Sequence, residues 1–248
     1  GSRISIEYGF RGPLLALPMG WSAGGHAIVS AAELIEFGHA EVALVVAADE
    51  VTPLTHEAMV ALGLARGSEA ANRFDAQPRI PFYPSEGAAA VVLETRVHAA
   101  KRGARPLLEL AGWGINSDAL GVGAKGRGHA SLAQTMKSAL ISAPESRVVL
   151  VCAGSYGSDD ADRTEREALA EIFGEPLCPP LINLRTVIGE TKAPAALFSL
   201  IAAAAWLVDH ARQSGSEHPE PRQSEDAVLC NAFWVNGTNA SLLVRRPK

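Results

Sequence analysis

Residues 20–38 read GWSAGGHAIVSAAELIEFG and residues 42–50 read VALVVAADE, and these two stretches decide the fold. Small residues crowd one side of positions 22–37, which predicts a closely packed helix, and Gly38 stands where a C-terminal cap is favoured. The Val-rich run at 42–48 is typical of a strand buried on both faces. We therefore expect a helix from this region to pack under a buried strand.

The remainder of the chain alternates helical patterns with short apolar runs. Strands are predicted at 88–93, 107–113, 147–152, 227–232 and 240–245, and helices at 95–102, 130–141, 163–173 and 191–210. A turn containing Asn236 and Gly237 joins the last two strands. This order favours an α/β fold in which helices cover both faces of a mixed sheet.

Composition excludes several classes of function. The 248 residues are 48% hydrophobic, which is enough for a sizeable core. The net charge is -5, so the composition does not indicate a basic surface for binding nucleic acid. The three cysteines form no CxxC pair and the seven histidines show no metal-ligand spacing, so we expect a reducing cytoplasmic setting and no metal or cofactor. The apolar run at 193–208, interrupted by Pro194 and Ser199, indicates a core helix rather than a membrane span.

Residues 20–24, GWSAG, match the GxSxG pattern of the hydrolase nucleophile elbow. In that interpretation Ser22 would attack a substrate after activation by a histidine, and an Asp or Glu would orient that histidine. The two histidines of the last quarter, His210 and His218, fall at a predicted helix end and in a polar loop, whereas a hydrolase needs its histidine after a strand. An α/β-hydrolase with a GWSAG elbow therefore remains an alternative.

A second family matches the same stretch and the chain beyond it. The matches follow the family's order and spacing. They are the helix and strand at 21–50, RIPF and SEGA at 79–88, VLE and HAAKRGA at 92–104, and the blocks at 153–174, 183–189 and 231–242. In these features the chain resembles the β-ketoacyl synthases. The resemblance implies a thiolase-like layered fold of two similar halves, with mixed sheets covered by helices. Residues 1–105 would be the remainder of the N-terminal half and 106–248 the C-terminal half, and the part of the family fold before the nucleophile is expected to be missing.

The chain departs from the family at its catalytic positions. Condensing enzymes use a cysteine at a helix N-terminus, where the helix dipole lowers the thiol pKa, and two histidines. The matching positions hold Trp21, Gly154 and Glu190, and the family's lysine appears as Arg185. In the closing block the gate region also differs, which makes these residues tunnel or gate candidates together with Trp21: Trp234, Val235 and Asn236.

At each of these positions a purely structural interpretation competes with a functional one. Trp21 is either a core aromatic or a gate. Glu190 is either a proton-handling acid or the partner of Arg185 in a structural ion pair, and we favour the pair. His26, inside the predicted nucleophile helix, is expected to be a packed core histidine rather than a base.

The leading interpretation is a non-catalytic ketosynthase-like subunit, a pseudoenzyme of the chain-length-factor type. Such subunits pair with an active ketosynthase and an acyl carrier protein in type II polyketide, polyene or fatty-acid-like biosynthesis. The alternative on the same fold is an acyltransferase or thioesterase that uses Ser22. A missing half-domain would leave sheet edges uncovered, so we also expect a chain that supplies the missing N-terminal part, or a homodimer, to cover the strand at 42–48 and the segment at 53–64.

Overall fold

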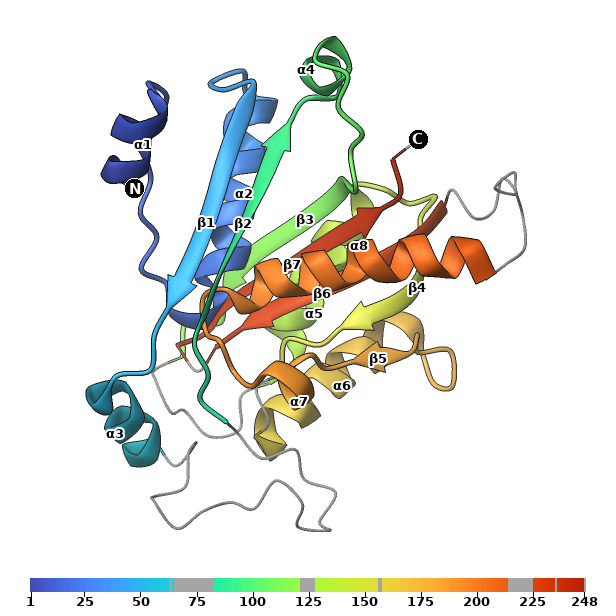
Figure 1. The fold of residues 1–248 in the computed structure, drawn as a ribbon. Helices are drawn as coiled ribbons and strands as arrows, with labels where there is room; N and C mark the ends of the chain where they lie inside the picture. Colours follow the sequence, from blue (N-terminus) through green and yellow to red (C-terminus); the bar gives the residue numbers. More distant parts are fainter. Residues whose placement is uncertain are drawn as a thin grey trace.

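A computed structural model describes residues 1–62, 64, 83–120, 128–155, 158–213, 225–234 and 236–247 (Figure 1). The RIPF stretch at 79–82 and the gate candidate Val235, both singled out from the sequence, lie outside these residues. No helix of the described ranges is long and apolar enough to cross a membrane.

The described elements alternate much as the sequence pattern predicts. The helices are α1 (Ser2–Tyr8), α2 (Ala23–Glu36), α3 (Pro53–Ala61), α4 (Arg96–Lys101), α5 (Ala130–Ile141), α6 (Asp159–Phe173), α7 (Arg185–Ile188) and α8 (Ala195–Gln213), and a 3₁₀ turn, η1 (Gly20–Ser22), leads into α2. The strands are β1 (Val42–Asp49), β2 (Gly87–Glu94), β3 (Glu109–Ser117), β4 (Arg147–Cys152), β5 (Leu181–Ile182), β6 (Asp226–Phe233) and β7 (Thr238–Arg245).

The strands of the described ranges form two sheets. Five of them follow the order β3-β7-β6-β4-β5, in which β4 runs parallel to β5 and β6, while β7 runs antiparallel to β6 and β3. The other two, β1 and β2, form an antiparallel pair. The mixed α/β fold predicted from the sequence is therefore confirmed, and this is not the eight-stranded, mostly parallel sheet of an α/β-hydrolase.

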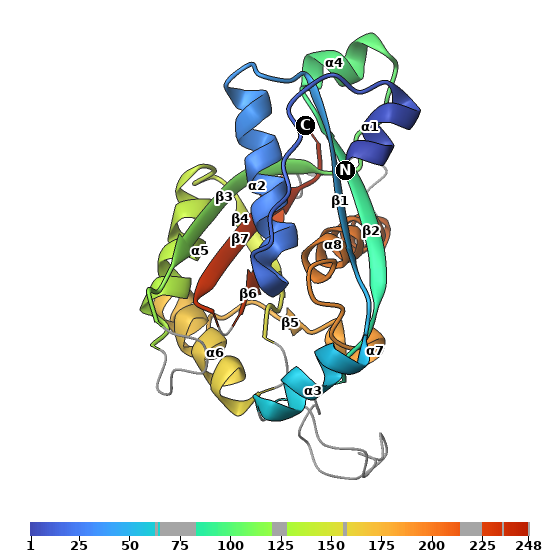
Figure 2. The same ribbon diagram turned by 90° about the vertical axis from the view of Figure 1, so that its left-hand side faces the viewer.

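The elements stack in four layers (Figure 2). Helices α5 and α6 cover one face of the five-stranded sheet, and α2 and α8 lie between its other face and the β1–β2 pair. Glycines allow α2 to approach closely, because a Cβ on Gly24 would lie 2.3 Å from the carbonyl oxygen of Ala193, and one on Gly25 would lie 2.8 Å from the Cβ of Ala240. The small residues of the opening stretch therefore position the start of α2 against the sheet.

Two expectations about local structure are wrong. Strand β1 is not buried on both faces: Val45 and Ala47 point into the core, but Val42 and Val46 are 46% and 45% exposed, because among the described residues a helical layer packs against one face of the pair only. The Ala-rich helix begins at Ala195 rather than at 191, because Lys192 takes a left-handed backbone conformation with φ 65° that breaks the helix.

Candidate functional site

The position predicted to match the family's nucleophile is occupied by a stack of two indoles. Trp21 lies in the 3₁₀ turn that opens α2 and is 5% exposed. Its ring stacks on that of Trp234, at the end of β6, with centroids 3.2 Å apart and planes inclined by 28°. Trp21 belongs to the buried core that also contains Met59 of α3 and Phe233, and Trp234 packs against that core. An indole has no atom that can attack a thioester, so this position carries no nucleophile.

Ser22, the alternative nucleophile, is fully buried beside the indoles. Its Oγ lies 2.5 Å from the hydroxyl of Thr238 and 3.3 Å from the carbonyl oxygen of Met19. The Thr238 hydroxyl donates in turn to Oδ1 of Asn236 at 2.7 Å, and the Asn236 amide donates to Met19 O at 3.4 Å. Hydroxyls, amides and carbonyls are poor proton acceptors, so these contacts position Ser22 without activating it.

His26 lies one turn further along α2 and is 6% exposed. Its side chain is hydrogen-bonded to the backbone of Asn239, and its Nε2 has no hydrogen-bond partner among the described residues. Burial lowers the pKa of the imidazole, and the bond to Asn239 offsets part of that effect. His26 is therefore a neutral, packed histidine, as expected from the sequence.

Stability is expected to fall on acidification because of His26. A folded-state pKa below the unfolded value means that the unfolded chain binds the extra proton first, so stability decreases as the pH falls below about 6.5. The loss is about 1.4 kcal/mol for each unit that separates the two pKa values. Urea unfolding at pH 7.5 and 5.5 measures it: His26→Gln should flatten the dependence, whereas His39→Gln, at an exposed histidine, should leave it unchanged. Equal slopes for the wild type and His26→Gln would contradict the assignment.

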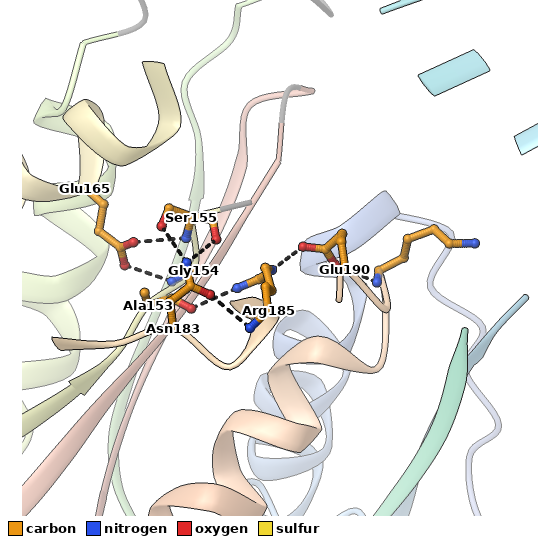
Figure 3. Close-up of polar contacts among 8 residues, drawn as sticks. Ala153, Gly154, Ser155, Glu165, Asn183, Arg185 and Glu190 are labelled. Atoms are coloured by element: carbon orange, nitrogen blue, oxygen red, sulfur yellow. Dashed lines mark hydrogen bonds and ion pairs between the residues drawn. The ribbon is translucent and has the colours of Figure 1, made fainter. Parts of the chain in front are cut away.

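The first histidine position, Gly154, follows the end of β4 in a closed turn. A Cβ placed there would lie 2.8 Å from the carbonyl carbon and oxygen of Asn231 and 2.8 Å from Cδ1 of Phe233. The backbone N–H groups of Gly154 and Ser155 each donate to the carboxylate of Glu165 at 2.9 Å (Figure 3). The space that a histidine side chain would need is therefore filled.

Glu165 holds this turn in place, a role that the sequence alone did not predict. It is 1% exposed on α6 and also accepts a hydrogen bond of 2.9 Å from Nδ2 of Asn231. Burial raises the pKa of its carboxyl, and the three N–H donors oppose that rise. The available signal was that Glu165 falls in the matched block at 153–174, whereas its partner Asn231 comes from a strand that is remote in the sequence.

The second histidine position, Glu190, is 1% exposed and forms an ion pair with Nε of Arg185. Arg185 lies between the two substituted positions, because its Nη1 donates to the carbonyl oxygen of Ala153 at 2.9 Å (Figure 3). The other oxygen of Glu190 accepts from the backbone N–H of Lys192 at 2.6 Å. Burial raises the pKa of the Glu190 carboxyl, and the nearby Arg185 charge opposes that rise. The favoured structural ion pair is therefore present.

A second buried cation ties this loop to the β1–β2 pair. Lys192 is 3% exposed, and its Nζ forms an ion pair with Asp49 and donates to the carbonyl oxygen of Glu50 at 2.5 Å. These acceptors lie at the end of β1. The loop that would carry the family's lysine and histidine is thus anchored on both sides by buried charges.

The fold brings the predicted site residues together. Trp234 stacks on Trp21, and the residue before it, Phe233, fills the space next to Gly154. Arg185 connects the turn at Gly154 to Glu190. The gathered groups are two indoles, a glycine and a neutralised ion pair. They fill the site with apolar surface and a buried ion pair.

Comparisons with known proteins agree with the fold and the sequence blocks. Residues 1–99 match the family model "Beta-ketoacyl synthase, N-terminal domain", and residues 107–212 match "Beta-ketoacyl synthase, C-terminal domain". The chain is 26% identical over 273 residues to the mitochondrial 3-oxoacyl-[acyl-carrier-protein] synthase of Arabidopsis thaliana, covering 97% of this chain and 58% of that protein. It is 28% identical over 267 residues to nodulation protein E of Rhizobium leguminosarum bv. trifolii, covering 98% and 64%.

Solved structures share the architecture. A type II polyketide ketosynthase in complex with its acyl carrier protein superposes with a TM-score of 0.84 at 22% identity, over 100% of this chain and 66% of that one. The ishigamide ketosynthase/chain length factor superposes with a TM-score of 0.74 at 22% identity, over 92% and 60%. The fold is thus the thiolase-like ketosynthase fold, and this chain spans 58% to 64% of the length of the curated relatives above. By its two domain matches and its fold, the chain belongs to the β-ketoacyl synthase family.

Proposed function

We propose that this chain is a non-catalytic ketosynthase-like subunit of the chain-length-factor type. It would act beside an active ketosynthase and an acyl carrier protein in polyketide, polyene or fatty-acid-like biosynthesis. The observation that carries the proposal is the stacked Trp21–Trp234 pair, which fills the position where the family places its nucleophile. The presence of a ketosynthase/chain length factor among the similar folds supports this kind of role.

The substitutions reinforce one another chemically. Decarboxylation of an extender thioester needs donors aimed at the developing negative charge, and loss of one such donor typically costs about a hundredfold to a thousandfold in rate. Gly154 offers no side-chain donor, and Glu190 places a carboxyl where the family has a histidine. Arg185 is held in place by these neighbours, because its Nε is paired with that carboxyl and its Nη1 donates to the carbonyl oxygen of Ala153. A partner subunit is therefore the better interpretation than an enzyme with altered chemistry.

The chain is expected neither to take up an acyl group nor to condense malonyl thioesters. Mass spectrometry after incubation with acyl and malonyl thioesters of an acyl carrier protein tests both steps, with the 3-oxoacyl synthase 2 of Rhizobium meliloti, which is 27% identical, as the positive control. Trp21→Cys should remain inactive in condensation, since neither histidine is restored. A stable acyl adduct on Ser22 that Ser22→Ala abolishes would overturn the proposal and favour an acyltransferase.

A further inference from the structure

Two cysteines face each other inside the five-stranded sheet. Cys152 ends β4 and Cys230 lies in β6, and the register of these two parallel strands places them directly opposite one another. They are 0% and 2% exposed and share the core cluster that includes Leu197 and Ala203 of α8. Side chains in register on adjacent strands project from the same face of a sheet. The two thiols therefore point into the same space between the sheet and α8.

The thiols form a short chain of hydrogen bonds. The Cys152 thiol donates to the carbonyl oxygen of Ser199 in α8, with 3.8 Å between the sulfur and the oxygen. A second hydrogen bond joins the side chains of Cys152 and Cys230. Since the single proton of Cys152 is directed at Ser199, Cys230 is the donor of that second bond. The bond to Cys152 and burial both raise the pKa of the Cys230 thiol, so Cys230 stays protonated at neutral pH.

The spacing of the two strands permits a bond between the sulfurs, but not a relaxed one. Neighbouring strands lie about 4.8 Å apart, whereas the Cα atoms of a disulfide are most often about 5.5–6 Å apart, within a range of about 4.4–6.8 Å. A disulfide that departs from the preferred geometry stores strain and is reduced more easily than a relaxed one. We propose that Cys152 and Cys230 form a reversible disulfide when the protein is oxidised by hydrogen peroxide.

The reaction balances with one molecule of peroxide. The thiolate of one cysteine attacks a peroxide oxygen and the O–O bond breaks, which gives a sulfenic acid and a hydroxide ion that takes up the proton lost by the thiol. The second thiol attacks the sulfenic sulfur, the S–S bond forms, and the S–O bond breaks to release water. Two electrons pass from the sulfurs to the peroxide oxygens, so the chain loses two hydrogen atoms and two molecules of water are formed.

Burial makes this oxidation slow in the folded protein. Ser199 lies over the pair and Cys230 is protonated, so peroxide reaches a thiolate there only when α8 opens locally. The third cysteine, Cys178, is partly exposed and has no second cysteine beside it in the register of the described strands. We therefore expect alkylating reagents to label Cys178 first and the opposed pair much later.

The disulfide would lie next to the candidate site, although neither cysteine is a position on which the proposed function rests. Cys152 precedes the turn at Gly154, and Cys230 precedes Asn231. The Glu165 carboxylate already joins these two segments, because it accepts from the backbone of Gly154 and from the side chain of Asn231. Strain in the bond would therefore act on the turn that Glu165 holds.

The Cys178→Ser variant tests the proposal, because it keeps the opposed pair and no other cysteine. After treatment with hydrogen peroxide, its intact mass should fall by two hydrogen atoms, and N-ethylmaleimide should label neither thiol after unfolding. Peptide mapping without reductant should show a linked pair of peptides that contain Cys152 and Cys230. The same map of the oxidised wild-type chain does not depend on any variant. Adding Cys230→Ser to Cys178→Ser should abolish the loss of two hydrogen atoms.

Reversibility provides a second measurement. Because the fold strains the bond only in the folded chain, reduced glutathione at equilibrium should open the disulfide at a lower concentration in the folded protein than in the same protein unfolded in urea. Circular dichroism establishes that the oxidised protein is folded. Two free thiols after prolonged oxidation, sulfonic acid at either cysteine without a link, or a link that forms only in urea would overturn the proposal. So would a folded disulfide that resists glutathione at least as well as the unfolded one.

Discussion

Replacing Arg185 with alanine is expected to lower the free energy of unfolding by about 3–5 kcal/mol. The variant would leave the Glu190 carboxyl 1% exposed and without its cation, and it would also remove the donor to the carbonyl oxygen of Ala153. A buried charge has lost its hydration, and without its partner that loss is no longer offset. Removing one partner therefore lowers the free energy of unfolding by more than the intact ion pair contributes to it. Urea denaturation measured by circular dichroism gives the change.

Two comparisons isolate the buried pair. Arg163→Ala removes an ion pair with Asp160 in which both side chains are about half exposed, so we expect a change within about 0.5 kcal/mol. The double variant Arg185→Met with Glu190→Leu removes both charges and should be more stable than Arg185→Ala alone, because no orphaned charge remains. If Arg185→Ala lowered the free energy of unfolding no more than Arg163→Ala, the Arg185–Glu190 ion pair would not be what stabilises the loop around Glu190.

Restoring the family's histidine with Gly154→His is expected to destabilise the fold rather than to repair the site. Even Gly154→Ala should cost about 1–3 kcal/mol, since its Cβ would press on the backbone carbonyl of Asn231, which cannot move without disturbing β6. The imidazole should cost more than the methyl group, because the ring must also displace Phe233, which lies 2.8 Å from the Cβ position.

Gly128→Ala is the matched control for that series. A Cβ at Gly128 would have no heavy atom of the described residues within 4 Å, so the substitution is expected to change stability by less than about 0.5 kcal/mol. Urea unfolding of the three variants should therefore order as Gly128→Ala, Gly154→Ala and Gly154→His, from most to least stable. A Gly154→His variant as stable as the wild type would show that the turn still has room for a catalytic side chain.

The local elements could be predicted from the sequence because their causes are local. The helix at 130–141 and the strand at 147–152 were predicted with the bounds that the structure shows, since the hydrophobic pattern that marks each lies within the segment itself. The short elements α1, α3, α7 and β5 were missed, because each has too few residues for a period to show clearly. The substituted positions Trp21, Gly154 and Glu190 were also identified from local matches alone.

The contacts that define the site depend on segments far apart in the chain. No local pattern shows that Trp21 stacks on Trp234, that Arg185 reaches both Ala153 and Glu190, or that Phe233 closes the turn. The same limit applies to β1: its apolar run predicted burial on both faces, whereas exposure depends on what packs against it. The sequence by itself predicted the order of the longer elements and the three positions, Trp21, Gly154 and Glu190, at which the family's catalytic residues are replaced. Only the tertiary structure decided that the vacated site is filled and that one sheet face is open, because both depend on neighbours that folding brings together.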